Sequence, residues 1–193
     1  MLDTPALWVD LDALERNIAH LAGTFRAAGV AWRPHIKGIK VPAVAHKALA
    51  AGAIGVTCAK LGEAEVMAAA GIPDLLIANQ VVGPKVARLA NLRRHADVKV
   101  CVDDPGNVAE LGRAATAAGV ELGVLVEVDV GMGRAGVAPG QPALDLARRV
   151  HQAPGLRFLG LMGWEGQARA IADLDLRRVE IERAVGQLTA SAA

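Results

Sequence analysis

The sequence contains no tyrosine, only two cysteines and few aromatic residues of any kind. Lysine and arginine number 21 against 20 acidic residues, so no excess of positive charge would attract nucleic acid or an anionic membrane surface. The sequence opens without a basic segment followed by an apolar run, and no stretch approaches the roughly 20 apolar residues of a membrane span. We therefore expect a cytoplasmic protein with a small-molecule partner and no nucleic-acid or membrane partner.

The two cysteines, Cys58 and Cys101, are far apart, and each lies in a short apolar run. No CxxC spacing is present, so buried free thiols are a better interpretation than a disulfide or a metal site. Hydrophobic residues make up 53% of the chain, enough for a large core. This composition predicts one globular domain over residues 1–193.

Helical and strand-like patterns alternate along the chain. Apolar residues at helical spacing between Leu11 and Phe25 predict a helix that Asp10 caps and Gly29 ends. Residues 30–37 predict a strand and its exit, and Pro42 opens a short helix that stops near Gly52. Five more strands are predicted at 54–58, 75–78, 98–102, 122–128 and 156–162. The helices after them are predicted at 63–70, 84–94, 105–118 and 141–151, with a last one from about Asp173. Strands separated by single helices predict a parallel sheet.

Two α/β architectures fit this alternation, a doubly wound open sheet and a TIM-type (β/α)8 barrel. No glycine-rich dinucleotide loop follows the first strand, and chemically interesting residues come just after nearly every strand. That distribution favours the barrel, whose active site is built from all the loops at its C-terminal face. About six of eight units are present, so we expect an incomplete barrel with unpaired edges, belonging to a longer protein.

Lys37 lies at the exit of the first predicted strand, where a barrel enzyme places groups that point into its pocket. A lysine there can act as an amine nucleophile, and Lys40 could supply a cationic neighbour. By position alone, however, both are better interpreted as solvated loop lysines.

A longer motif changes this interpretation. The stretch from Arg33 to Lys40 reads Arg-Pro-His-Ile-Lys-Gly-Ile-Lys. It resembles the cofactor-lysine motif of the D-threonine aldolase and D-serine dehydratase family, whose members are the fold type III relatives of alanine racemase. Further segments resemble the family in order and spacing, at residues 4–18, 59–65, 79–83, 101–105 and 129–137. Together they span nearly the whole chain, which makes coincidence a poor explanation.

The resemblance implies that Lys37 carries pyridoxal 5'-phosphate (PLP) as a Schiff base. It also implies that Arg134, in the stretch Gly131-Met132-Gly133-Arg134, donates to the phenolic oxygen of the cofactor and so tunes its electronics. The two glycines in this stretch give the backbone the freedom to approach a ligand closely.

Four further residues complete the predicted site. By resemblance, Trp164 would lie against the pyridine face, where its ring can shield the cofactor from water. His35 is expected to position the lysine or carry a proton. Asn79 ends the third strand and can offer an amide donor to the cofactor. Asp129, at the end of the fifth strand, is preferred over Glu127 as the carboxylate of the site.

The chain departs from the family in several places. Gly38 and Ile39 stand where typical members carry Thr-His, and Trp164 stands where they often carry tyrosine. The family holds the PLP phosphate with a glycine-rich segment and a divalent metal (Mn, Mg or Zn) with a His-x-Cys or His-x-Asp pair in a C-terminal β-domain. This sequence has no such glycine-rich segment, and no such pair follows its last predicted strand. A chain that ended at residue 193 could therefore be inactive by itself.

The resulting hypothesis is a PLP-dependent lyase that cleaves D-β-hydroxy amino acids by a retro-aldol reaction to glycine and an aldehyde. Three alternatives remain open: a D-serine dehydratase-like deaminase, an amino-acid racemase and a non-catalytic PLP-binding protein. A racemase commonly pairs a lysine with a tyrosine, which this sequence lacks. Fold type III enzymes are usually dimers, so a homodimer is expected by resemblance.

Overall fold

Five short apolar runs form one parallel sheet in the computed structural model, which describes residues 3–192. The strands are β1 (Val56–Cys58), β2 (Asp74–Ile77), β3 (Asp97–Val102), β4 (Leu122–Val128) and β5 (Leu156–Gly163). Each strand pairs in parallel with the next one in the sequence, in the order β1-β2-β3-β4-β5. The sheet does not close on itself, so the architecture is the incomplete α/β barrel that the sequence predicts.

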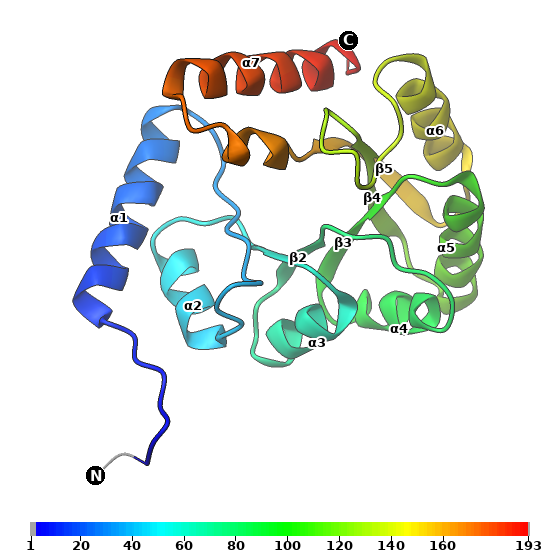
Figure 1. Ribbon diagram of the computed structural model, residues 1–193. Coiled ribbons are helices and arrows are strands. Elements are labelled where there is room, and N and C mark those ends of the chain that lie inside the picture. Colours follow the sequence, from blue (N-terminus) through cyan, green and yellow to red (C-terminus); the bar gives the residue numbers. More distant parts are fainter. Residues whose placement is uncertain (1–2, 193) are drawn as a thin grey trace.

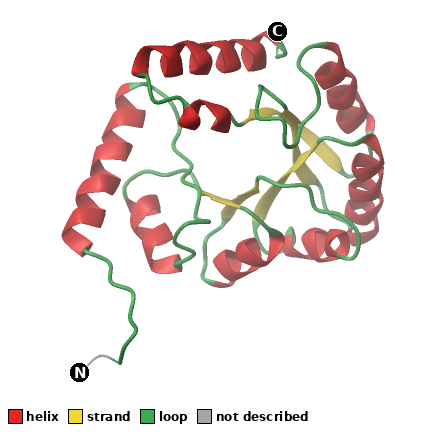
Figure 2. Ribbon diagram, in the orientation of Figure 1, coloured by secondary structure: helices red, strands yellow, loops and turns green. Residues whose placement is uncertain are grey.

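Helices surround this sheet and alternate with its strands (Figures 1 and 2). They are α1 (Leu11–Ala27), α2 (Pro42–Ala50), α3 (Leu61–Ala69), α4 (Lys85–Leu92), α5 (Pro105–Ala118), α6 (Gln141–Gln152), the 3-10 helix η1 (Gly166–Ala170) and α7 (Leu174–Ala190). Asp10 caps α1 as predicted, because its carboxylate accepts the Ala13 N–H at 2.9 Å. Figure 1 shows the helices as a ring around the strands, with α7 between α1 and α6.

The first predicted strand, residues 30–37, is not a regular strand. Only His35 forms a β-bridge, to Thr57. The segment nevertheless runs beside β1, because the N–H groups of Ile54 and Thr57 donate to the carbonyl oxygens of Trp32 and Pro34, at 2.9 and 2.8 Å. The three residue steps from Ile54 to Thr57 thus lie opposite only two steps, from Trp32 to Pro34. The nitrogen of Pro34 also carries no hydrogen to donate. The first of the six predicted barrel units is therefore present but irregular.

The core lies between the sheet and the helices. Strand β4 is largely buried on both faces, as expected for a parallel strand covered by helices, whereas β3 is buried on the face of Val98 and Val100 and carries Asp97 and Lys99 on the other. The fully buried side chains of the sheet include Val56, Leu75, Ile77, Val98, Val100 and Val124.

Both cysteines are buried free thiols, as predicted. Burial raises the pKa of the Cys58 thiol to about 12, and it raises the pKa of Cys101 as well. Neither side chain is a thiolate at neutral pH, so neither is a nucleophile in this fold. Among residues 3–192, no helix combines the length and apolar character that a membrane crossing requires.

Candidate functional site

The chemically interesting residues follow the ends of the parallel strands, which gathers them at one end of the barrel. Lys37 comes two residues after the bridge at His35, and Trp164 comes directly after β5. The Lys37 Nζ lies 5.8 Å from the centroid of the Trp164 ring, which is within reach of a cation–π interaction. The structure thus brings together two residues that the sequence placed in the first and last barrel units.

Lys37 sits in a tight, exposed turn. Its backbone N–H donates to Nδ1 of His35 at 3.2 Å. Burial and the nearby charge of Lys37 lower the pKa of His35, whereas the charge of Glu63 opposes this shift. His35 is therefore neutral at pH 7, with its hydrogen on Nε2 because Nδ1 is the acceptor. Within the described residues, no carboxylate forms an ion pair with the Lys37 ammonium, so no acidic side chain holds it away from a ligand.

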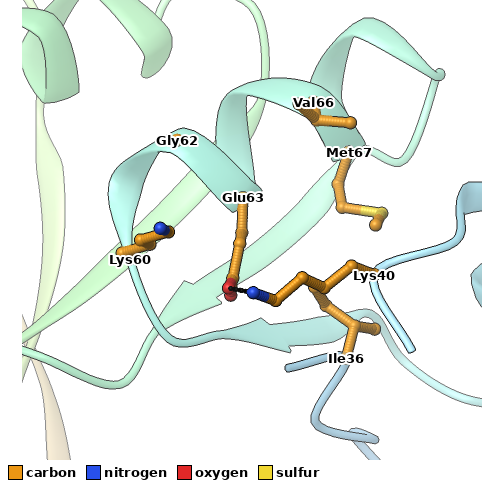
Figure 3. A pocket seen from close by; sticks show the side chains of 7 residues that line it. All are labelled: Ile36, Lys40, Lys60, Gly62, Glu63, Val66 and Met67. Carbon is orange, nitrogen blue, oxygen red and sulfur yellow. Dashed lines mark ion pairs between the residues drawn. The ribbon is translucent and has the colours of Figure 1, made fainter. Parts of the chain in front are cut away.

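Lys40 does not extend the positive charge around Lys37 in the way that the sequence suggested. Its ammonium points toward Glu63, at 3.4 Å from the Oε1 of that carboxylate (Figure 3). The two residues line a hollow beneath the turn, so the charge of Lys40 is largely balanced by its partner.

Two carboxylates, each of which follows a strand, hold the loop of residues 129–136 that carries Arg134. The Asp129 carboxylate accepts the N–H groups of Gly133 and Gly131, each at 3.0 Å, and these hydrogen bonds lower the pKa of Asp129. Asp103, after β3, accepts the N–H of Gly136 at 2.9 Å. The Asp129 carboxylate is therefore engaged within its own loop, and its predicted contact with the cofactor stays a prediction.

The guanidinium of Arg134 faces a buried carboxylate. Its Nη2 lies 3.9 Å from Oε1 of Glu127, whose side chain is 4% exposed. Gln80 donates to Oε2 of Glu127 at 2.6 Å. Burial raises the pKa of Glu127, while the Gln80 hydrogen bond and the charge of Arg134 act in the opposite direction. Sequence reasoning ranked Glu127 below Asp129, yet Glu127 is the carboxylate nearer to Arg134.

Trp164 lies over a glycine that has no side chain to obstruct it. A Cβ added at Gly166 would collide with Nε1 of Trp164 and lie 3.0 Å from the sulfur of Met132. The indole remains 37% exposed, so one part of its surface is open for a ligand. Asn79, after β2, is exposed and makes no side-chain hydrogen bond within residues 3–192.

These groups fit the ring end of PLP. An unpaired lysine amine can bind an aldehyde covalently, an arginine can donate to a phenolic oxygen, and an indole can cover an aromatic ring. The same residues offer no metal site, because the described part of the chain holds no cluster of three or more His, Cys, Asp or Glu side chains that could bind a metal ion.

Comparison with known proteins identifies what the chain resembles. The family model described as alanine racemase, N-terminal domain, matches residues 9–192. D-threonine aldolase from Arthrobacter sp is 40% identical over 193 residues, which cover 100% of this chain and 51% of that protein. 3-Hydroxy-D-aspartate aldolase from Paracoccus denitrificans (strain Pd 1222) is 39% identical, with 97% of this chain and 49% of that protein covered.

A solved structure gives the same result. The crystal structure of D-threonine aldolase from Filomicrobium marinum superimposes with a TM-score of 0.95 and 47% identity, over 98% of this chain and 52% of that chain. The chain thus spans about half the length of the relatives that it matches.

Proposed function

We propose that this chain, which belongs to the family of alanine racemase N-terminal domains, forms the lysine-bearing part of a PLP-dependent lyase for D-β-hydroxy amino acids. The reaction would be retro-aldol cleavage to glycine and an aldehyde. The observation that carries the proposal is the unpaired amine of Lys37 facing Trp164 at the mouth of the barrel. The names of the two aldolase relatives support the choice of reaction.

Three residues would hold the cofactor. Lys37 would bind it covalently through its amine, Arg134 would donate to its phenolic oxygen, and Trp164 would cover one face of its ring. When bound, PLP supplies an electron-accepting ring for the bond that breaks in the substrate. The protein's own contribution is to orient the substrate and to exclude water from the ring face that the indole covers.

His35 would act through the backbone of Lys37. Its Nδ1 accepts the Lys37 N–H at 3.2 Å, so the imidazole fixes the turn from which the lysine side chain projects. Because its pKa is lowered, His35 is also neutral at physiological pH and adds no positive charge beside the amine.

Reduction with borohydride tests the cofactor lysine. We expect PLP to give a visible absorption band with the purified chain, and reduction to fix the label on Lys37. Lys37→Ala should abolish the band, whereas Lys60→Ala, which removes another exposed lysine near the same turn, should retain it. Peptide mapping that places the label on a different residue, or finds none, contradicts the proposal.

Product analysis tests the reaction. D-threonine, D-serine and L-alanine are incubated with the PLP-loaded protein, with and without manganese. Glycine and acetaldehyde from D-threonine are expected. Pyruvate and ammonia from D-serine would instead indicate a dehydratase, and D-alanine from L-alanine would indicate a racemase. A loaded protein inert toward all three would favour a non-catalytic PLP-binding protein.

The homodimer and the cytoplasmic location expected from the sequence remain predictions. Light scattering would test the first, and cell fractionation would test the second.

A further inference from the structure

We propose that Glu63 is a positioning residue for Lys37: through its ion pair with Lys40, it closes the turn that carries Lys37 onto helix α3. The effect of this closure on the chemistry rests on the proposed role of Lys37. The closure itself rests on the geometry of the turn and does not depend on that role.

The turn is anchored at its first residue. The Ile36 N–H donates to the carbonyl oxygen of Thr57 in β1 at 2.9 Å. The Ile36 carbonyl oxygen in turn accepts the N–H groups of Ile39 and Lys40, at 3.0 and 2.8 Å. Lys37 therefore lies between a fixed point on the sheet and the residue at which the turn ends.

That last residue has an unusual backbone conformation. Lys40 has φ +58°, and among the described residues it is the only one other than glycine with a positive φ. A side-chain-bearing residue keeps this left-handed conformation only when its surroundings stabilise it. From this residue the Lys40 side chain extends toward α3, where Oε1 of Glu63 lies 3.4 Å from its Nζ.

Glu63 is a fixed anchor rather than a mobile surface charge. It is the third residue of α3, where the N-terminal end of a helix favours a negative charge. Its second oxygen, Oε2, accepts the N–H of Ala59 at 2.7 Å, and its side chain is only 8% exposed. The carboxylate therefore holds its position whether or not Lys40 is present.

The space beneath the turn is hollow. A cavity of about 360 Å³ lies there, lined by Ile36 from the turn and by Met67 from α3, together with three charged residues, Lys40, Lys60 and Glu63. Figure 3 shows the Lys40 side chain reaching over Ile36 to Glu63. Ile36, at the start of the turn, packs in one core cluster with Met67 of α3, whereas Lys40, at the end of the turn, reaches the helix through its ion pair with Glu63. The charge of Glu63 also reaches the site, since it raises the pKa of His35 against the effect of Lys37.

Two substitutions that remove one partner each test the proposal. We expect Glu63→Gln and Lys40→Met to accelerate amide hydrogen exchange at Ile39 and Lys40. Both should also slow the covalent reaction of PLP with Lys37, followed by visible absorption, by about tenfold, because a misplaced reacting group loses much of its advantage of proximity. Lys40→Arg keeps the ion pair, so its hydrogen exchange and its rate of reaction with PLP should both stay at wild-type values.

The matched control is Glu65→Gln. Glu65 lies on the same helix and pairs with Arg88, with Oε1 at 3.0 Å from Nε. Loss of this second pair perturbs α3 without touching the turn, so it should change neither readout.

Several outcomes would overturn the proposal. A folded Glu63→Gln protein with wild-type exchange and wild-type reaction rate would do so. An effect of Glu63→Gln that Lys40→Met does not reproduce would also do so, because Glu63 would then act through Ala59 alone. If Glu63→Gln fails to fold, Lys40→Met decides, since the Lys40 side chain is 55% exposed. If the wild-type protein forms no adduct with PLP, the proposed function fails, and the exchange measurements still decide whether the ion pair closes the turn.

Discussion

The ammonium of Lys37 lies 5.8 Å from the centre of the Trp164 ring, although the two residues belong to opposite ends of the open sheet. Residues 32–36 run beside β1, the first strand of the sheet, whereas Trp164 follows β5, the last one. The cation and the aromatic face therefore meet across the mouth of the barrel rather than within one β/α unit. Four predictions test how the residues around this contact work.

Replacement of the indole should weaken cofactor binding. We expect Trp164→Ala to reduce PLP affinity roughly two- to thirtyfold, which corresponds to the loss of about 0.5–2 kcal/mol of ring contacts. Trp164→Phe keeps an aromatic face, so its PLP affinity should lie between those of the wild type and Trp164→Ala. Absorption titration with PLP measures the affinity. Trp8→Ala, which removes an exposed tryptophan outside the site, is the control and should bind PLP like the wild type.

The two glycines that flank Arg134 should tolerate alanine very differently. At Gly136 (φ +104°), a Cβ would lie 2.6 Å from the backbone nitrogen of Asp129 and 2.8 Å from the carbonyl carbon of Val128. We expect Gly136→Ala to lower the free energy of unfolding by about 3 kcal/mol or more. At Gly133 (φ +64°) a Cβ meets open space, so alanine should cost about 1 kcal/mol. Urea denaturation compares the two variants, and equal losses would contradict the geometry.

Asp74 should support stability without affecting the site. Its carboxylate accepts from Arg33 at 2.6 Å and from Lys99 at 2.7 Å. Although burial opposes the shift, these two partners lower the pKa of Asp74 below its usual value of 3.8. We expect Asp74→Asn to lower the free energy of unfolding at pH 7 by about 1 kcal/mol.

The pH dependence of this effect has a defined sign. A lowered carboxyl pKa contributes stability that is complete above pH 3.8 and is lost as the pH falls through the folded-state pKa. The difference between wild type and Asp74→Asn should therefore shrink on acidification, while PLP binding by the variant stays at the wild-type level. A difference that is constant with pH would show that the charge of Asp74 is irrelevant.

The Glu127 carboxylate should strengthen PLP binding and lower the free energy of unfolding. Glu127→Gln removes a buried charge but keeps an oxygen that can accept from Gln80. Because Arg134 loses its acidic partner, PLP affinity should fall roughly two- to fivefold, the range for a partly exposed ion pair. The urea midpoint at pH 7 should stay equal or rise, since burial disfavours the carboxylate.

The wild type should also lose stability as the pH rises from the usual carboxyl pKa of 4.5 through the raised pKa of Glu127, because the folded state holds this proton more tightly. Glu127→Gln should lack that loss. If Glu127→Gln had a lower urea midpoint and an unchanged PLP affinity, this role of Glu127 would be refuted.

Local signals explain which elements the sequence predicted correctly. Helix α5 has the predicted bounds, because Asp104 caps its start by accepting the Asn107 N–H and Gly119 (φ +66°) ends it in the left-handed conformation. Strand β4 also has the predicted bounds, 122–128. The segment 30–37 failed as a regular strand because its pairing depends on the register of β1, which local pattern does not report.

The candidate site was predictable only in part. The cofactor-lysine motif pointed to Lys37, and the order of the strands placed Trp164 at the same end of the barrel. Arg33, from the same motif, lies away from Lys37 and pairs with Asp74 at the start of β2. The pairing of Glu127 with Gln80 joins the ends of two strands that are not adjacent, and strand alternation in the sequence carries no information about such a partner.

The strand order β1-β2-β3-β4-β5 also determines how the protein can assemble. Since each strand docks on the one made just before it, every βα unit leaving the ribosome meets an edge that is already in place. Folding can therefore follow synthesis without closing long loops. Because Lys37 and Trp164 belong to the first and last units, we expect the amine of Lys37 to meet its aromatic neighbour only after the scaffold beneath both has formed.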